Sequence, residues 1–259
     1  MQISLSHLSF VRSGNQILQD INLTLNENQH YCLIGPNGAG KTTLLSILCG
    51  LEWPTSGNAI ITDLNKEPTP PAHSKKSFGY FMPRYATYLE TYHPSITPIE
   101  LICTGFNQAL ANYIEPTPQQ RQQAEKPFHT YIASTKPDRP FHTLSTGERF
   151  RILLLRTLVT EPPIVILDEP FDGLDLPGRL SFEKLIINSV AKHARLSLSV
   201  LHRIEEIPTF VTNIILLKNG RIVSQGPKSQ TLTSENLSNL YDMKLICHHH
   251  NGRYYVVND

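Results

Sequence analysis

A glycine-rich stretch that ends in a lysine and two threonines is the part of this chain best suited to bind phosphate. It follows an apolar run at residues 31–34 and contains the pattern G-x-x-x-x-G-K-T. Glycines let backbone amides turn inward around phosphate groups, and a following helix adds the positive end of its dipole. Lys41 can reach the β- and γ-phosphates, and the Thr42 hydroxyl can ligate Mg²⁺. The residues expected to bind a nucleotide here are Gly35, Pro36, Asn37, Gly38, Ala39, Gly40, Lys41, Thr42 and Thr43.

Two carboxylates, Asp168 and Glu169, directly follow a second apolar run at residues 164–167. In open α/β sheets the ligand lies beyond the carboxyl ends of the strands, where the glycine-rich stretch also begins. We therefore expect Asp168 to hold Mg²⁺ through water and Glu169 to orient or deprotonate the attacking water, a role worth about 10² to 10⁴ in rate. An acidic pair after a strand is also common as a helix cap or solvated turn, and the upstream phosphate loop favours the catalytic interpretation.

A serine and a glycine precede a third pattern, a helix with apolar residues at positions 152, 153, 155 and 158. The Ser145 hydroxyl and the Gly147 backbone could form a second anion site at the start of that helix. The chain's own phosphate loop does not need such a site, so it would imply a second subunit. The alternative is an ordinary capping box in which Ser145 bonds to the backbone near Glu148, and the residues alone favour this alternative.

A histidine and an aspartate complete the set of candidates. His202 closes the apolar run at residues 196–201, and Asp175 ends the segment PFDGLD that follows Glu169. A histidine at a strand end can hydrogen-bond a γ-phosphate, although a lone histidine there is usually a surface residue. The order of the motifs along the chain favours the phosphate contact.

The elements that must position these residues alternate between strands and helices. Residues 21–25 alternate apolar and polar side chains like a half-exposed strand, and the apolar runs already named suit buried strands. Helical spacing follows Gly40 and Ser145 and resumes from Pro177. This alternation predicts a mostly parallel sheet that is covered on both faces.

Two Asn-Gly dipeptides predict β-hairpins because Asn and Gly tolerate the positive φ angles of a type I′ turn. Asn219-Gly220 lies between residues 214–217 and 222–223, and Asn251-Gly252 lies between residues 244–250 and 253–257. The second hairpin would contain Cys247 and three successive histidines. Because neighbouring residues of a strand point to opposite faces, they cannot all bind one ion, so we expect a hairpin rather than a metal site.

Composition bounds the remaining possibilities. The 259 residues suit one large domain with a lobe attached, and twelve of the 19 prolines lie between Pro54 and Pro140, which predicts a separate lobe of short helices and loops. The net charge of +1 shows no basic field, so no direct nucleic acid partner is expected. Four isolated cysteines argue against a disulfide framework. No apolar run is long enough to span a membrane and no secretory signal is visible, so we expect a cytoplasmic protein.

Taken in order, these motifs resemble the ATP-binding cassette of ABC proteins. Its phosphate loop is followed by a signature, here residues 144–148, an acidic strand ending in Asp168 and Glu169, a D-loop that contains Asp175, and a switch histidine, here His202. The resemblance covers most of the chain and implies an α/β P-loop NTPase core with a mostly parallel sheet, an antiparallel β lobe and an inserted α-helical lobe at about residues 84–146. It implies an ATP-binding domain at residues 1–240, and the predicted hairpin falls in an extension at residues 241–259.

The resemblance also implies how the site works, with ATP and Mg²⁺ as cofactors. Two cassettes, expected to be a homodimer, would sandwich two ATP molecules, each between the phosphate loop of one subunit and the signature of the other. Closure by ATP and opening after hydrolysis would shift a population between two arrangements. The helical lobe would contact transmembrane permease subunits at the cytoplasmic face of the membrane. The residues implied at the site, besides the phosphate loop, are Lys41, Glu169 and His202 for catalysis, Thr42 and Asp168 for the metal, and Ser145, Thr146, Gly147 and Asp175 across the dimer.

Three positions depart from the family pattern. Arg12, with Phe10 nearby, aligns where an aromatic residue usually stacks on adenine. No glutamine is present at residues 78–84, which align with the loop that normally supplies one to Mg²⁺ and water, so Pro83 or Arg84 takes its place. The signature reads Ser-Thr-Gly-Glu rather than Ser-Gly-Gly-Gln.

Two functions remain open. The leading hypothesis is the ATPase subunit of a membrane transporter, and it rests on the family resemblance. The alternative is a soluble cassette that regulates or remodels a nucleic-acid or ribosomal partner. A chromosome-maintenance protein is disfavoured because the interval between Thr42 and Ser145 is too short for a long coiled-coil arm. A GTPase is disfavoured because Asn65-Lys66 continues with Glu-Pro and no aspartate to bind guanine.

Overall fold

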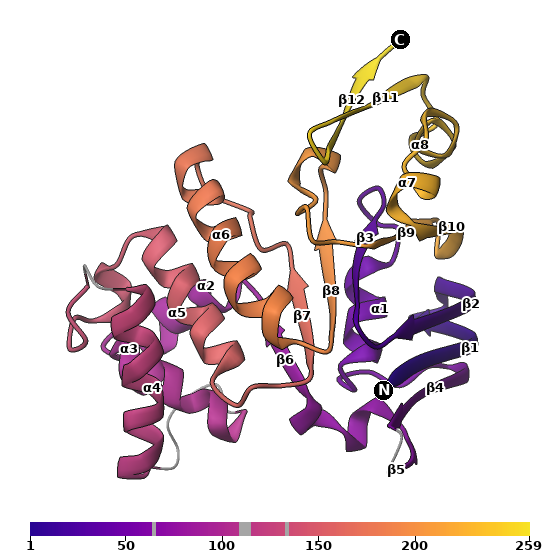
Figure 1. The fold of residues 1–259 in the computed structure, drawn as a ribbon. Coiled ribbons are helices and arrows are strands. Elements are labelled where there is room, and N and C mark those ends of the chain that lie inside the picture. The colour runs from indigo at the N-terminus through magenta and orange to yellow at the C-terminus, as the bar shows by residue number, and fades with distance from the viewer. Residues whose placement is uncertain (64–65, 109–114, 133–134) are drawn as a thin grey trace. The chain divides into compact units, whose positions relative to one another are not determined.

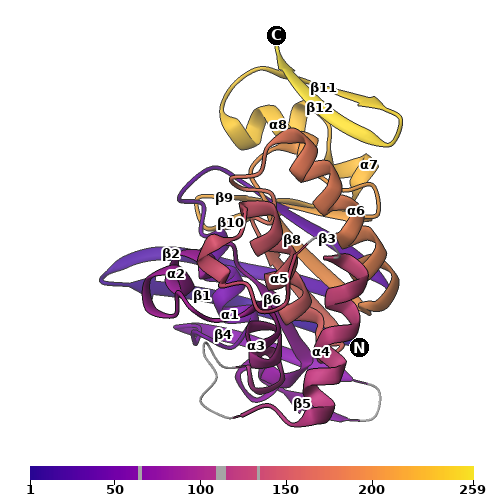
Figure 2. The same cartoon turned by 90° about the vertical axis from the view of Figure 1, so that its left-hand side faces the viewer.

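The computed structural model describes residues 1–63, 66–108, 115–132 and 135–259 (Figures 1 and 2). Asn65, which was considered above as part of a guanine-binding motif, lies outside the described residues. So do two short parts of the expected helical lobe, residues 109–114 and 133–134. The chain divides into two compact units, residues 1–78 with 195–259 and residues 79–194. No helix of the described ranges is long and apolar enough to cross a membrane.

The first unit contains strands of three sheets. One is antiparallel, in the order β2-β1-β4-β5, and a second, in which the order is β10-β9-β3-β8, places β3 parallel to both β8 and β9. The third is the antiparallel pair β11-β12. The elements of this unit are β1 (Gln2–Arg12), β2 (Asn15–Asn26), β3 (Gln29–Ile34), α1 (Lys41–Leu48), β4 (Ser56–Asp63), β5 (Lys66–Thr69), η1 (Pro71–His73), η2 (Lys75–Ser77), β8 (Leu196–Leu201), η5 (Ile204–Glu206), β9 (Asn213–Lys218), β10 (Arg221–Pro227), α7 (Lys228–Thr231), α8 (Ser234–Tyr241), β11 (Leu245–His250) and β12 (Arg253–Asn258).

Burial follows the sequence pattern in β2, β3 and β8. In β2, Ile21, Leu23 and Leu25 are buried while the residues between them are exposed, as a strand with one covered face requires. In β3 and β8, the apolar runs are buried throughout, as expected for strands covered on both faces. The prediction of a parallel core with an antiparallel lobe is confirmed.

Both Asn-Gly dipeptides form hairpin turns with positive φ at each residue, 48° and 73° at Asn219-Gly220 and 48° and 77° at Asn251-Gly252. In the second hairpin, Cys247 is half-buried, whereas His248 is exposed and stacks on Tyr255 with ring centroids 5.1 Å apart. Within the described ranges, no group of three or more His, Cys, Asp or Glu side chains could hold a metal ion.

The second unit contains two adjacent strands, β6 and β7, and most of the helices. Its elements are β6 (Phe78–Phe81, of which Phe78 belongs to the first unit), α2 (Tyr85–Tyr92), α3 (Pro98–Cys103), η3 (Thr104–Asn107), α4 (Pro118–Tyr131), η4 (Phe141–Thr143), α5 (Thr146–Leu158), β7 (Ile164–Asp168) and α6 (Leu176–His193). Phe81, Phe150 and Phe182 pack against one another with ring centroids 5.6 to 5.9 Å apart, which joins β6, α5 and α6 in one aromatic core.

The proline-rich stretch is more varied than its composition predicts. Pro98 and Pro118 occupy the first turns of α3 and α4, behind threonine capping boxes, which fits the expected short helices. The start of the stretch, before the expected helical lobe, instead forms the strands β4, β5 and β6. Pro68 fits there because β5 lies at the edge of its sheet, where a missing backbone donor is tolerated.

Candidate nucleotide-binding site

The glycine-rich loop connects β3 to α1 in the first unit. Gly40 is the N-cap of α1 with φ of 101°, and a Cβ there would lie 2.8 Å from the Leu18 side chain and 2.9 Å from the Ile17 carbonyl oxygen. A Cβ at Gly35 would lie 2.1 Å from the carbonyl oxygen of Leu217. Both positions therefore exclude any residue larger than glycine for steric reasons.

The loop presents its donors in the way that anion binding requires. No side chain caps the N-terminus of α1 and no acidic residue lies in its first turn, so the helix dipole is not offset there. Lys41 is buried, and its Nζ donates to the carbonyl oxygens of Gly35 and Pro36 at 2.8 and 3.0 Å. Thr42 is exposed at the same helix end. The loop can therefore supply backbone amides, one ammonium group and one hydroxyl to a phosphate chain.

The first Asn-Gly turn holds this loop in place, a role that the sequence did not indicate. The backbone N–H of Gly220 donates to the carbonyl oxygen of Ala39 at 3.0 Å, and the carbonyl oxygen of Gly220 accepts from Gln19 N at 2.8 Å. A Cβ at Gly220 would lie 2.4 Å from the carbonyl oxygen of Ile17. The β9–β10 turn therefore fixes the phosphate loop against β2.

The two residues considered for adenine contact already have partners. Phe10 is buried, and the Arg12 guanidinium lies 5.3 Å from its ring centroid. Arg12 also donates to Glu52 Oε1 at 2.6 Å. Adenine could stack on the outer face of this guanidinium, whereas the buried Phe10 ring is covered.

The acidic strand end lies in the second unit. Asp168 ends β7 with 6% of its surface exposed, and its Oδ2 accepts from the Tyr80 hydroxyl at 3.3 Å. The Arg84 guanidinium lies 4.0 Å from the same oxygen. Glu169 follows in the left-handed region, with φ of 50°, and is half-buried. Strain of this kind collects at functional sites, so the turn is consistent with a role for Glu169.

The oxygen donors of Thr42 and Asp168 suit Mg²⁺, a hard cation that prefers hydroxyl, carboxylate and phosphate oxygens. The segment expected to be a loop at residues 78–84 is partly a strand, since Phe78–Phe81 form β6. Only Met82 and Pro83 form the turn before Arg84, which begins α2 as its N-cap. Pro83 and Arg84, the two residues expected in place of the family's glutamine, thus lie between β6 and α2, and the Arg84 guanidinium already forms an ion pair with Asp168.

The signature residues begin α5, and the capping-box alternative is confirmed. Ser145 Oγ accepts from the backbone N–H of Glu148 at 3.3 Å, and Glu148 Oε2 accepts from Ser145 N at 2.9 Å. Thr146 is exposed, and nothing lies within 4 Å of a Cβ built on Gly147. Ser145 remains exposed although it caps the helix, so the capping box is compatible with a ligand at this helix end.

Asp175 and His202 lie at exposed positions. Asp175 caps α6, and its Oδ1 accepts from Gly178 N at 2.9 Å. Next to it, Leu176 and Leu180 expose 61% and 41% of their surfaces. His202 follows β8 and lies in the first unit, as does the whole phosphate loop at residues 35–43. The signature residues, the acidic strand end and Asp175 belong to the second unit.

The chain is similar to ATP-binding proteins of ABC transporters. A model of the family "ABC transporter" matches residues 18–172. The uncharacterized ABC transporter ATP-binding protein YlmA of Bacillus subtilis is 32% identical over 253 residues, which are 93% of this chain and 91% of that protein. A second such protein, YmeB of Lactococcus lactis, is 29% identical over 98% of both chains. The fold also matches the ATP-binding cassette MJ0796, solved as a dimer bound to ADP and Pi, with a TM-score of 0.70 at 20% identity over 87% of this chain and 98% of that chain.

Proposed function

The chain belongs to the ABC transporter family and is an ATPase of that family, and from this premise we propose that two copies of it power a membrane transporter by closing around ATP. The proposal is carried by the family match together with the N-terminus of α1, which no side chain caps and which begins with the buried Lys41. This combination gives the phosphate chain backbone amides, a helix dipole and an ammonium group from one element.

Each residue has a stated part in the proposed reaction. Lys41 and the loop amides bind the β- and γ-phosphates, and the Thr42 hydroxyl and Asp168 carboxylate hold Mg²⁺. When bound, Mg²⁺ neutralises charge on the phosphates. Glu169 orients and deprotonates the attacking water, and His202 donates a hydrogen bond to the γ-phosphate. The exposed positions of Thr42 and His202 leave both side chains accessible to a nucleotide.

The second half of each site comes from the other copy in this proposal. Ser145, Thr146 and Gly147 bind the γ-phosphate of the partner's ATP, and Asp175 lies at the dimer interface. Two observations support the pairing. Ser145 and Thr146 are exposed at a helix N-terminus, which favours anions. Leu176 and Leu180 expose apolar surface next to Asp175, as residues of an interface core do.

The partners follow from the names of the relatives, which are ATP-binding proteins of ABC transporters. We propose that transmembrane permease subunits dock on the helical lobe, about residues 84–146, and hold the chain at the cytoplasmic face of the membrane. The ATP-binding domain would cover residues 1–240, with the hairpin in an extension at 241–259. Fractionation of native cells tests this part, since a free or ribosome-bound pool with no membrane complex would contradict it.

The Glu169→Gln variant tests the pairing of cassettes. It removes the base but keeps the phosphate and Mg²⁺ contacts, so turnover should fall by about 10² to 10⁴ while ATP binding persists. Sedimentation with ATP and Mg²⁺ should then show a stable dimer. A variant that stays monomeric and hydrolyses ATP at the parental rate would contradict the assignment of Glu169.

A further inference from the structure

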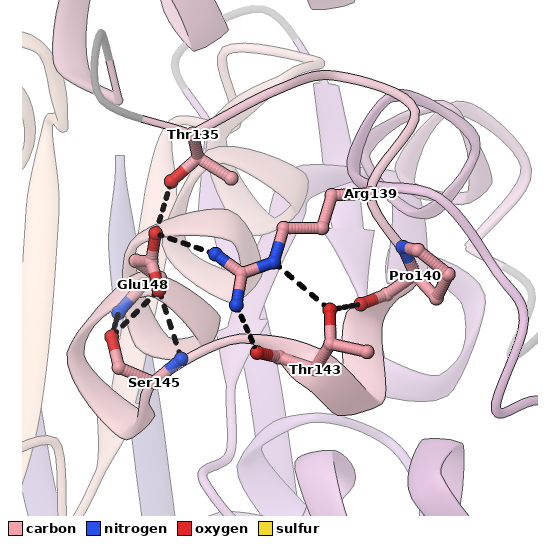
Figure 3. A network of polar contacts seen from close by, with 6 residues as sticks. All are labelled: Thr135, Arg139, Pro140, Thr143, Ser145 and Glu148. Atoms are coloured by element: carbon pink, nitrogen blue, oxygen red, sulfur yellow. Dashed lines mark hydrogen bonds and ion pairs between the residues drawn. The ribbon is translucent and has the colours of Figure 1, made fainter.

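The carboxylate of Glu148 lies at the centre of a polar network beside the signature serine (Figure 3). Its Oε2 accepts hydrogen bonds from Ser145 N and Oγ at 2.9 and 2.8 Å. Its other oxygen, Oε1, accepts from the Thr135 hydroxyl and lies 3.9 Å from Arg139 Nη1. Two neutral groups and one cation therefore meet on a single carboxylate.

The identity of this residue creates an electrostatic problem for the proposed site. The family pattern places a neutral glutamine here, whereas this chain places a carboxylate next to the hydroxyl that should meet a γ-phosphate. Two anions brought together in a partly desolvated contact repel each other unless a cation compensates one of them. The Glu148 side chain is only 22% exposed, so water screens that repulsion incompletely.

Arg139 is held in the position that such a cation needs. Its Nε donates to Thr143 Oγ1 at 3.0 Å and its Nη2 donates to the Thr143 carbonyl oxygen. Thr143 is itself fixed, because its hydroxyl donates to the Pro140 carbonyl oxygen at 2.7 Å. The guanidinium is thereby braced on one side, and its remaining nitrogen, Nη1, faces Glu148 (Figure 3).

The protonation state of Glu148 agrees with this role. Burial raises the pKa of its carboxyl, but hydrogen bonds from Thr135 and Ser145 and the charge of Arg139 outweigh burial and hold the pKa below its usual value. Glu148 is therefore charged at neutral pH, and its charge needs a partner whenever a phosphate approaches Ser145.

We propose that Arg139 is a positioning residue that neutralises Glu148, so that Ser145 can receive the phosphate of the ATP bound by the partner subunit. The proposal rests on the proposed function, because it assigns Ser145 to that phosphate. It differs from a purely structural role for Arg139 in one respect: the need for the arginine disappears once Glu148 is made neutral.

The test uses dimer formation in the Glu169→Gln chain, measured by sedimentation over a range of ATP concentrations with Mg²⁺. Arg139→Ala should raise the ATP concentration for half-maximal dimer about tenfold. Arg139→Gln, which keeps amide donors for Thr143 but lacks the charge, should show a similar loss. Adding Glu148→Gln to either variant should restore the parental value to within about twofold. Thermal unfolding of each chain shows that it is folded.

Thr143→Val provides the matched control, because it removes one brace of the guanidinium without changing any charge. It should shift the ATP requirement by less than about threefold. Arg139 variants that match the parent overturn the inference, and so does a loss that persists after Glu148→Gln, since that result assigns Arg139 to bracing alone. A Glu169→Gln parent that never dimerises overturns the proposed function and this inference together.

Discussion

Asp168 and Arg84 lie close enough that a bound cation would compete with the guanidinium. The two side chains are 4.0 Å apart, and the arginine side chain is 63% exposed, so the ion pair is weak and easily displaced. We predict that Arg84→Gln lowers the Mg²⁺ concentration for half-maximal ATPase activity, by up to about fivefold. A Mg²⁺ titration of the hydrolysis rate measures this, and Arg84→Lys, which keeps the charge, should change it less.

Pro83→Gln addresses the missing glutamine directly. Proline restricts the turn between β6 and α2 and offers Mg²⁺ no side-chain oxygen. Restoring the family residue should raise Mg²⁺-dependent ATPase activity, and the rate across the same Mg²⁺ titration measures it. If neither Pro83→Gln nor Arg84→Gln alters the rate or the Mg²⁺ requirement, another group fills the role of the glutamine.

At the scale of elements, the β9–β10 turn holds the phosphate loop. Two glycines in matching turns, Gly220 and Gly252, distinguish the effect of backbone conformation from that of steric contact. Gly220 and Gly252 occupy equivalent turn positions with φ of 73° and 77°. A Cβ on Gly220 would meet the Ile17 carbonyl oxygen at 2.4 Å, whereas one on Gly252 would meet only Thr209 Cγ2 at 3.8 Å. The first turn is thus constrained by both backbone conformation and contact, and the second by conformation alone.

We predict that Gly252→Ala lowers the free energy of unfolding by about 1 kcal/mol and that Gly220→Ala lowers it by about 3 kcal/mol. Gly220→Ala should also weaken ATP binding. The clash of its Cβ with the Ile17 carbonyl oxygen displaces the turn, and the N–H of residue 220 then no longer holds Ala39 of the phosphate loop in place. Urea unfolding and calorimetry measure the two effects. Equal losses of stability in both variants, with unchanged ATP affinity, would show that the β9–β10 turn does not position the loop.

The sequence predicts best those elements whose pattern is formed by neighbouring residues. The alternation in β2, the apolar runs of β3, β7 and β8 and the Asn-Gly turns each depend on neighbouring residues, and all are present. Local spacing has no means to predict the contact of Tyr80 with Asp168, which are 88 residues apart, or the anchoring of Ala39 by Gly220. Residue type also could not show that Phe10 is covered rather than open to a base.

At the scale of the whole molecule, the central claim is that one copy's phosphate loop works with the other copy's signature. Lys41 and Ser145 belong to different compact units of the chain, and the proposal assigns them to different ATP molecules. Lys41→Ala removes the ammonium group that the loop carries, and Ser145→Ala removes the signature hydroxyl at a cost of about 1 kcal/mol to the helix cap. Each variant alone should therefore be nearly inactive while remaining folded.

Mixing these two inactive variants tests the claim most directly. A mixed dimer has one intact site, built from the phosphate loop of the Ser145→Ala chain and the signature of the Lys41→Ala chain. Random pairing makes about half of the dimers mixed, so the ATPase rate of an equimolar mixture should reach roughly a quarter of the parental rate. If the mixture never exceeds the average of the two variants measured alone, each chain uses its own residues and the shared site is contradicted.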